Sequence, residues 1–235
     1  LRGGPRLGTY YFEKGTGCRP TRVVYDRAGS SFATAKRSDF DWPSLLNGID
    51  AFYFSGITPA ISDDHAGAVA DALACCKKKG IPVVCDLNYR GKMWSTEKAR
   101  TVMNSLMPFV TVCIANDEDF EATLGIRAFD GDMSRGIEQI DSYRAGMQEI
   151  VRRYPNCKIV ASVLRNIQSV EESDWLGILL QDGKFCESPI QHAHVMEGVA
   201  GGDSFGAALV HGLLNRWDPE QVIGFAIAAG VLKMT

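Results

Sequence analysis

Long apolar runs are missing from the 235-residue chain. The longest, residues 222–232, contains glycine and alanine and is far shorter than the ~20 residues that a membrane-spanning helix needs. Residues 1–20 lack an apolar core followed by a small-residue cleavage site, so no secretory signal peptide is recognisable. These absences argue against an integral membrane protein and against a secreted one.

Charge of one sign and paired cysteines are also scarce. The net charge is −3 and no long basic run occurs, which argues against nucleic acid or an anionic membrane as a partner. The seven cysteines form no Cys-x-x-Cys pair, and several lie inside apolar strand-like runs. We therefore expect buried, reduced thiols and a cytoplasmic protein, rather than a disulfide framework or a zinc site.

Histidine is rare, with only four in the chain. His192 and His194 would share one face of a strand, but no acid or third ligand stands beside them in the sequence. His65 and His211 stand alone. We interpret all four as surface or packing residues rather than as metal ligands.

What the sequence does contain is an alternation of strand-like and helical segments. Residues 7–13 and 22–27 flank a turn-rich stretch, which predicts an antiparallel pair. From residue 41 onward, apolar runs alternate with segments of helical period. The predicted strands are 51–55, 82–86, 110–114, 158–163 and 175–181, and the predicted helices are 62–79, 96–107, 117–124, 134–154, 203–216 and 219–233.

This order predicts an α/β fold with a mostly parallel sheet that is covered by helices on both faces. Residues 1–40 would form a small β unit with its connection, and residues 41–235 the core. Three predicted strands end in polar stretches, DLNYR (86–90), ANDED (115–119) and LRN (164–166). Ligands of such sheets bind at the carboxyl ends of the strands, so we expect these stretches to share one edge.

The stretch GVAGGDSFG (198–206) combines small residues with one acid at a predicted helix start. The first N–H groups of a helix lack partners, and glycine lets an anion approach them closely. Asp203 would repel that anion unless it accepts a proton from a hydroxyl while a phosphoryl group is held beside it. By itself, the stretch is explained more simply by an Asp N-cap behind a Gly-Gly turn. It is not a Walker A loop, because no Gly-Lys-Ser/Thr follows.

Two other groups of polar residues allow a functional and a structural interpretation. Asn116, Glu118 and Asp119 follow an apolar strand and suit Mg²⁺, although an N-cap with acids in the first helical turn explains them more simply. Tyr25, Arg27 and Arg90 could bind an anionic small molecule, since arginine matches the geometry of a carboxylate. Each arginine alone is more typical of a solvated surface.

Taken together, these stretches resemble a known family. GGDSFGAALVHGLL (201–214) is similar to the C-terminal signature of the ribokinase-like, or PfkB, carbohydrate kinases. Within that family, the chain resembles the 2-keto-3-deoxygluconate kinases over nearly its whole length. The segments that carry this likeness are RLGTYYFEKG (6–15), VVYDRAGSSFA (23–33), FSGITPAIS (54–62), DLNYRGKMWS (86–95) and ANDEDFEATLG (115–125).

The resemblance implies a three-layer α/β/α sandwich with a small β lid, and ATP-dependent phosphorylation of a sugar-acid hydroxyl. It implies Asp203 as the catalytic base and Ala200, Gly201 and Gly202 as the anion hole for the transferring phosphate. Asn116 and Asp119 match the ends of the family's Asn-x-x-Glu motif for Mg²⁺, held through water. The implied sugar-acid contacts are Tyr10, Tyr25, Arg27 and Arg90, and the implied nucleotide contacts are Ser162, Arg165 and Asn166.

The chain departs from the family at several points. Asp119 is one methylene shorter than the usual Glu. Ala200 stands where the cradle usually has Gly, and it would be strained at a positive φ. The family's first strand and its glycine-rich substrate segment would precede this chain, and a stretch that encloses adenine would follow it.

The function that we predict is the ATP-dependent conversion of 2-keto-3-deoxygluconate to its 6-phosphate, with a possible homodimer through the lid. The alternatives are another PfkB-type kinase, acting on fructose, ribose or a nucleoside, and an inactive ligand-binding fragment. Two arginines in the predicted sugar site favour an acid over a neutral sugar.

Overall fold

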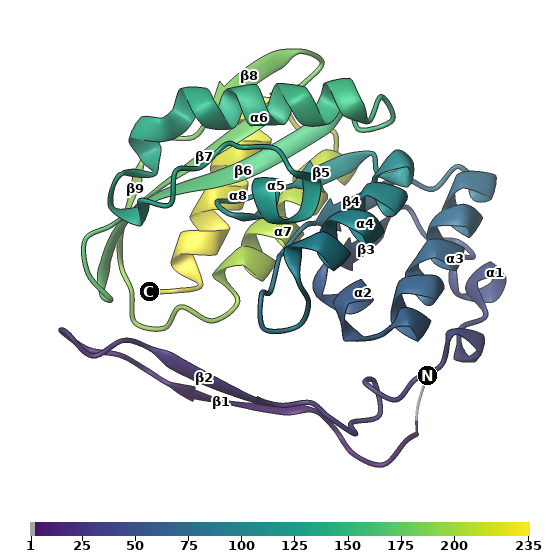
Figure 1. Ribbon diagram of the computed structural model, residues 1–235. Helices are drawn as coiled ribbons and strands as arrows, with labels where there is room; N and C mark the ends of the chain where they lie inside the picture. The colour runs from purple at the N-terminus through teal and green to yellow at the C-terminus, as the bar shows by residue number, and fades with distance from the viewer. Residues whose placement is uncertain (1–2) are drawn as a thin grey trace.

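A small antiparallel hairpin stands apart from the rest of the chain in the computed structural model, which describes residues 3–235. Strands β1 (Thr9–Glu13) and β2 (Arg22–Asp26) pair antiparallel, with Tyr10 opposite Tyr25. The Arg6 guanidinium holds the base of the hairpin, donating to Asp26 Oδ1 at 2.6 Å and to the Ala28 carbonyl at 2.6 Å. We call residues 9–26 the lid hairpin; Figure 1 shows it running along one side of the core.

The core is built on a seven-stranded sheet. Its strands are β3 (Phe52–Ser55), β4 (Val83–Asp86), β5 (Val112–Ile114), β6 (Ile159–Ile167), β7 (Glu172–Gln181), β8 (Lys184–Glu187) and β9 (Gln191–His194). They follow the order β3-β4-β5-β6-β7-β8, and β9 also pairs with β7. β3 to β6 run parallel, because a helical crossover returns each strand to the same starting edge. β6 and β7 are joined by a short turn and are therefore antiparallel.

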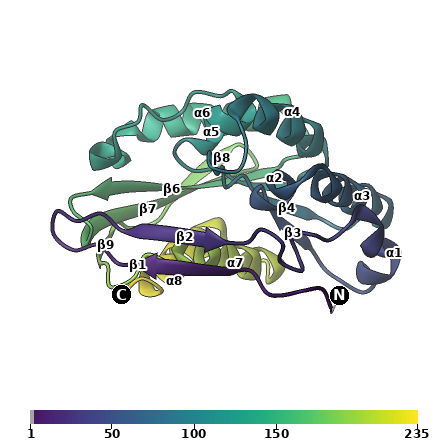
Figure 2. The same ribbon diagram turned by 60° about the horizontal axis from the view of Figure 1, so that its bottom comes forward.

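Helices cover both faces of this sheet. One face carries α3 (Asp63–Lys79), α4 (Thr96–Leu106), α5 (Asp119–Leu124) and α6 (Ile140–Arg153), and the short helices α1 (Trp42–Leu45) and α2 (Ile57–Ile61) precede them. The other face carries α7 (Gly201–Leu214) and α8 (Pro219–Leu232). Figure 2 shows the sheet between these two layers.

The alternation of side chains along the strands explains the two layers. Cys85 packs in the cluster with α3 to α6, whereas its neighbour Val84 packs with α7 and α8. Successive side chains of a strand point to opposite faces, so a strand that is apolar on both faces must be covered twice. The predicted three-layer α/β/α sandwich with a small β lid is confirmed.

The structure corrects some predicted boundaries. The strand predicted at 158–163 continues to Ile167, because it pairs with β7 along its whole length, so Arg165 and Asn166 belong to a strand rather than to a loop. The helix predicted from 134 begins at Ile140, after two 3₁₀ turns. Gly136 passes so close to β6 that a Cβ would lie 2.5 Å from the Arg165 carbonyl oxygen. The chain therefore lies against β6 at Gly136, and the helix begins only after this contact.

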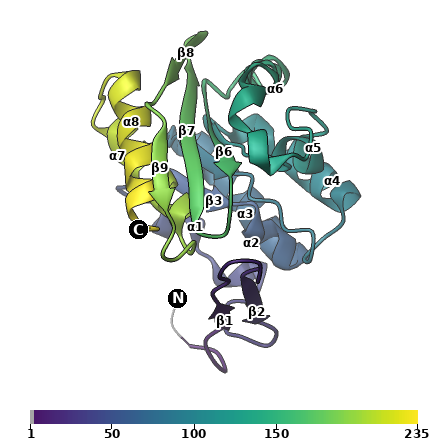
Figure 3. The ribbon, with the colours of Figure 1, turned by 90° about the vertical axis from the view of Figure 1, so that its left-hand side faces the viewer.

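The edge of the sheet toward which β6 points faces the lid hairpin (Figure 3). The tip of the hairpin reaches the core at the β6–β7 turn, where Thr16 Oγ1 donates to Glu171 Oε1 at 2.9 Å. Among residues 3–235, no helix is both long enough and apolar enough to span a bilayer.

Candidate active site

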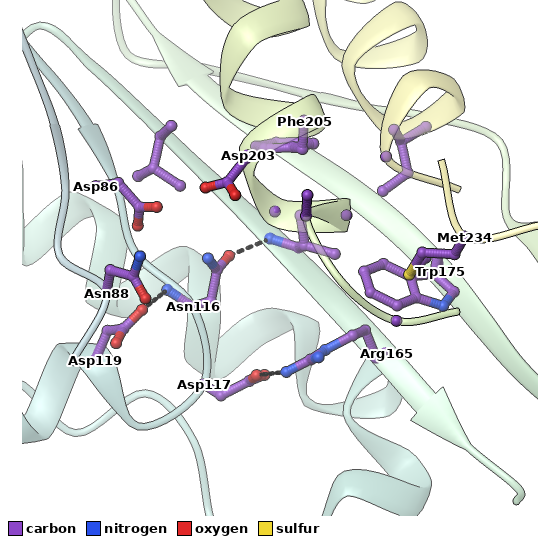
Figure 4. Close-up of a pocket in the computed structure, with 18 of the residues that line it drawn as sticks. Asp86, Asn88, Asn116, Asp117, Asp119, Arg165, Trp175, Asp203, Phe205 and Met234 are labelled. Carbon is purple, nitrogen blue, oxygen red and sulfur yellow. Dashed lines mark hydrogen bonds and ion pairs between the residues drawn. The ribbon is translucent and has the colours of Figure 1, made fainter. Parts of the chain in front are cut away.

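A cavity of about 350 Å³ opens where the polar strand ends meet the start of α7 (Figure 4). We call it the strand-end cavity. It collects residues from β4, β5, β6 and α7 that lie far apart in the sequence. The predicted site residues that line it are Arg90, Asn116, Asp119, Arg165, Ala200, Gly201, Gly202 and Asp203.

Two side chains that accept hydrogen bonds from backbone amides join the ends of β4 and β5 to each other and to the middle of β6. Asp119 Oδ1 accepts from the Tyr89 amide at 2.7 Å, and Asp119 Oδ2 accepts from the Asn116 amide at 3.1 Å. Asn116 Oδ1 in turn accepts from the Val163 amide at 2.8 Å. The segments that follow β4 and β5 are thereby joined to each other and to β6.

Both Asp119 oxygens already accept a backbone amide and the residue is only 7% exposed, which favours contact with a metal through water over a direct bond. Burial raises the pKa of Asp119 to about 7, and the nearby charge of Asp86 adds to the effect. The two amide hydrogen bonds oppose that rise. Within residues 3–235, no group of three His, Cys, Asp or Glu side chains is arranged to hold a metal ion.

The start of α7 has unused donors that face the cavity. Ala200 is the N-cap, and no side chain caps the first turn. Gly201, Gly202 and Asp203 are the first three helical residues, so their N–H groups are the ones that an α-helix leaves without partners. The helix dipole adds positive potential at this point, which favours an anion there.

Asp203 is exposed at the mouth of this turn. Within residues 3–235, no side chain or backbone group forms a hydrogen bond or ion pair with its carboxylate. A free carboxylate beside an anion site can accept a proton from a hydroxyl that approaches the bound anion. The geometry therefore allows the role that the resemblance implied.

Ala200 has the strained backbone that a positive φ would cause. Its φ is +63° and its ψ is +14°, in the left-handed region. Residues 3–235 include five non-glycine residues with positive φ, and three of them, Asn88, Asp117 and Ala200, line the strand-end cavity. Asn and Asp tolerate this conformation because their side chains bond locally, whereas Ala has no such compensation. Strain of this kind gathers at functional sites.

Gly201 is required by packing rather than by its dihedral angles. A Cβ at this position would lie 2.8 Å from the Met234 sulfur. The Met234 carbonyl also accepts from the Met196 amide at 2.7 Å and from the Glu197 amide at 3.0 Å. The residue that follows α8 therefore holds the turn that leads into α7.

Asp86, which the sequence analysis did not select, is a second carboxylate of the cavity (Figure 4). It is only 7% exposed, and its side-chain partner is Tyr53, whose hydroxyl donates to Oδ2 at 3.4 Å. Burial raises the pKa of Asp86 to about 6, and the charge of Asp203 raises it further, while Arg90 and Tyr53 oppose the shift. Its place at the end of an apolar strand was the sequence signal that could have identified Asp86 as a site residue.

Arg165 lines the cavity and is positioned by neighbouring side chains. It forms an ion pair with Asp117, whose other oxygen accepts from the Tyr143 hydroxyl at 2.8 Å. The guanidinium also lies 5.3 Å from the ring centroid of Trp175, its partner across the β6–β7 ladder. Only the strand register brings Asp117 and Trp175 to Arg165, so the sequence pattern did not reveal them.

The other two predicted nucleotide contacts lie outside the cavity. Ser162 is fully buried and donates to the Ala115 carbonyl. Asn166 accepts from the Ile137 amide at 2.9 Å and donates to Glu138 at 3.2 Å, so it anchors a 3₁₀ turn to β6. Both side chains already have structural partners.

The predicted sugar-acid contacts are divided between two places. Arg90 lines the strand-end cavity, whereas no lid residue of the described chain does so. Tyr10 and Arg27 line a separate cavity of about 480 Å³ at the root of the lid hairpin. Tyr25 stacks beneath Arg27, whose guanidinium lies 4.3 Å from the ring centroid. The structure thus groups the lid residues with each other but not with Asp203.

Comparisons with known proteins agree with this geometry. The sequence pattern of the pfkB family carbohydrate kinases matches residues 3–235. The chain belongs to this family. The crystal structure of 2-dehydro-3-deoxygluconokinase from Thermotoga maritima is 40% identical, with a TM-score of 0.92, and the match covers 100% of this chain and 69% of that one.

Two further relatives place the chain among sugar kinases of this family. A pfkB family carbohydrate kinase from Listeria grayi is 35% identical, with a TM-score of 0.88, over 99% of this chain and 69% of its own. The 2-dehydro-3-deoxygalactonokinase of Haloferax volcanii is 28% identical over 98% of this chain. The match spans 65% of that relative's length.

The strain at Ala200 leads to a first prediction. Ala200→Gly should raise the free energy of unfolding by about 1 kcal/mol, because glycine adopts a positive φ without the steric cost that alanine has. Urea denaturation would measure the change. Gly202→Ala is the matched control: a Cβ at Gly202 meets no atom within 4 Å, so this variant should not gain stability by relief of strain. A loss of stability in Ala200→Gly would contradict the assigned conformation.

The buried carboxylate of Asp86 leads to a second prediction. The folded protein retains the Asp86 proton up to about pH 6, whereas an unfolded chain releases it near pH 4. This carboxylate therefore lowers the stability of the folded state as the pH rises from about 4 to 6. Asp86→Asn should be more stable than the wild type by about 2–3 kcal/mol at pH 7 and similar to it at pH 4. Equal differences at both pH values in urea denaturation would contradict the prediction.

Proposed function

We propose that this protein is a sugar-acid kinase that transfers the γ-phosphoryl group of ATP to the 6-hydroxyl of 2-keto-3-deoxygluconate. The observation that carries the proposal is the start of α7. There, unpartnered N–H groups lie beside a free carboxylate at the mouth of a polar cavity. An anion site and a base at one helix start suit phosphoryl transfer to an alcohol.

The proposed chemistry follows from these groups. Asp203 accepts the proton of the attacking hydroxyl, and the hydroxyl oxygen bonds to the γ-phosphorus as the bond to the ADP oxygen breaks. The N–H groups at residues 200–203 hold the charge of the transferring phosphoryl group. Because the turn is already formed, these donors need no rearrangement as that charge develops.

The donor set fits Mg²⁺ bound together with ATP rather than by the protein alone. Mg²⁺ in kinases is typically held by one or two carboxylates, by waters and by the phosphates of the substrate. The cavity offers oxygen donors, but no group of three acids in residues 3–235 is arranged as a cage. Asn116 and Asp119 would act through water, and bound Mg²⁺ would neutralise charge on the phosphates.

The choice of a sugar acid rests on the arginines and on the relatives. Arg90 lies in the strand-end cavity, where its guanidinium can pair with a carboxylate. We propose that Tyr10, Tyr25 and Arg27 contact the acid when the lid hairpin moves against the cavity. The Haloferax volcanii relative is named for the galactonate epimer, so 2-keto-3-deoxygalactonate is the second candidate substrate.

Two further proposals concern the oligomeric state and the cellular compartment of the protein. The lid exposes Tyr10, Tyr11, Val24 and Tyr25, and an apolar surface of this kind favours pairing with a second lid in a homodimer. Sedimentation velocity would test that pairing.

All seven cysteines are free, which supports a reducing cytoplasm.

The base assignment gives a third prediction. Asp203→Asn should lower kcat by about 10²–10⁴-fold, because the amide cannot accept the hydroxyl proton. The affinity for ATP should stay within a few fold, since the N–H groups of the turn remain. A coupled assay of ADP release, combined with nucleotide titration, would measure both. Undiminished turnover would contradict the role of Asp203, and inactivity of the wild type toward every sugar would favour a binding fragment.

Substrate selection gives a fourth prediction. The wild type should phosphorylate 2-keto-3-deoxygluconate in preference to fructose, ribose and nucleosides. Arg90→Gln should raise KM for the acid by about tenfold or more through the lost ion pair, and should leave neutral sugars little affected. The same ADP assay over this set of sugars decides the point. A preference of the wild type for a neutral sugar would contradict the proposed substrate.

A further inference from the structure

A second cluster of ionisable side chains lies on the sheet away from the strand-end cavity. Strands β7 and β9 lie side by side (Figure 3), and their register places Asp174 opposite His192 and Glu172 opposite His194. Trp175 lines the strand-end cavity, so its neighbour Asp174 points to the other face of the sheet. The acids that the sequence did not show beside the histidines are supplied by this register.

Each histidine is paired through the same ring nitrogen. His192 Nδ1 lies 2.5 Å from Asp174 Oδ1, and His194 Nδ1 lies 2.6 Å from Glu172 Oε1. A neutral imidazole that donates from Nδ1 carries its lone pair on Nε2. The two Nδ1 atoms face carboxylates, which leaves Nε2 of each ring as the nitrogen available to a ligand, and the side chains are 83% and 61% exposed.

The spacing of the two rings suits chelation. Residues two apart on a strand lie on one face, about 7 Å apart along the strand. Hydrogen bonding of the second ring nitrogen to a carboxylate is the arrangement that orients histidine ligands in metal sites. Asp174 is itself fixed, because its Oδ2 accepts from Gln168 Nε2 at 2.9 Å. The pair is thus oriented by neighbours that only the folded sheet supplies.

We propose that His192 and His194 form a two-histidine site for a divalent transition-metal ion, namely Cu²⁺, Ni²⁺ or Zn²⁺, with water completing the coordination. Imidazole nitrogen selects these ions over Mg²⁺ and Ca²⁺, which prefer oxygen. Asp174 and Glu172 bond to the Nδ1 atoms, and within residues 3–235 no group of three His, Cys, Asp or Glu is arranged to hold a metal, so the protein supplies two nitrogens. The site is separate from the strand-end cavity and does not rest on the proposed kinase activity.

Titration with Cu²⁺ tests the proposal, because imidazole sites generally hold Cu²⁺ most tightly. The wild type should bind one equivalent in the presence of excess Mg²⁺, and electron paramagnetic resonance should show nitrogen ligands. His192→Gln and His194→Gln should each weaken binding by about tenfold or more, through loss of one of two ligands. His211→Gln, which changes an exposed histidine on α7, is the matched control and should bind as the wild type does.

The carboxylate partners separate an oriented site from two independent surface histidines. Asp174→Asn and Glu172→Gln keep both ligands and should still weaken Cu²⁺ binding by about 10–100-fold. Thermal unfolding gives an independent readout: Zn²⁺ should raise the melting temperature of the wild type and not that of either histidine variant. Unchanged Cu²⁺ affinity in His192→Gln or His194→Gln, or an equal loss in His211→Gln, would overturn the proposal.

Discussion

The candidate site depends on three hydrogen bonds that join neighbouring parallel strands of the sheet. The Asp119 carboxylate accepts hydrogen bonds from the amides of Tyr89 and Asn116, and the Asn116 side chain accepts one from the amide of Val163. Without these three hydrogen bonds, the polar segments that follow β4 and β5 would be separate loops, each free to move. With them, these segments form one wall of a cavity opposite the start of α7. Asp119, one methylene shorter than the family's usual Glu, thus joins the segments that follow β4 and β5 through its own hydrogen bonds.

Charge in the cavity is arranged around the same edge. Asp86, Asp119 and Asp203 bring three carboxylates together, and burial of the first two raises their pKa values. The N–H groups of α7 and the Arg90 guanidinium supply the opposing positive potential. A polyanionic ligand that brings its own cations is compatible with this mixture, because fixed acids and fixed donors each find a partner. The same mixture is compatible with ATP and Mg²⁺, the ligands that we propose for this site.

Much of this arrangement could be predicted from the sequence, and the reasons for the rest are specific. Apolar runs followed by DLNYR and ANDED revealed both the parallel strands and the edge at which polar residues meet. Arg165 was expected there too, but its partners Asp117 and Trp175 follow from a left-handed backbone and a hairpin register, which no local pattern encodes. Ser162 and Asn166 show a similar limit. Their polar side chains satisfy the protein's own backbone, and composition cannot distinguish that use from ligand binding.

The contact between Met234 and Gly201 links the chemistry of one sulfur atom to the anion site. Met234 is 2% exposed and fills the space that a side chain at position 201 would need. Oxidation would convert this thioether into a polar sulfoxide, which a buried, closely packed position does not accommodate. A sulfoxide would disturb the packing against Gly201, beside the turn whose amides donate to the Met234 carbonyl. A buried thioether outside the first turn of α7 is therefore a point at which oxidation would disturb the proposed phosphate site.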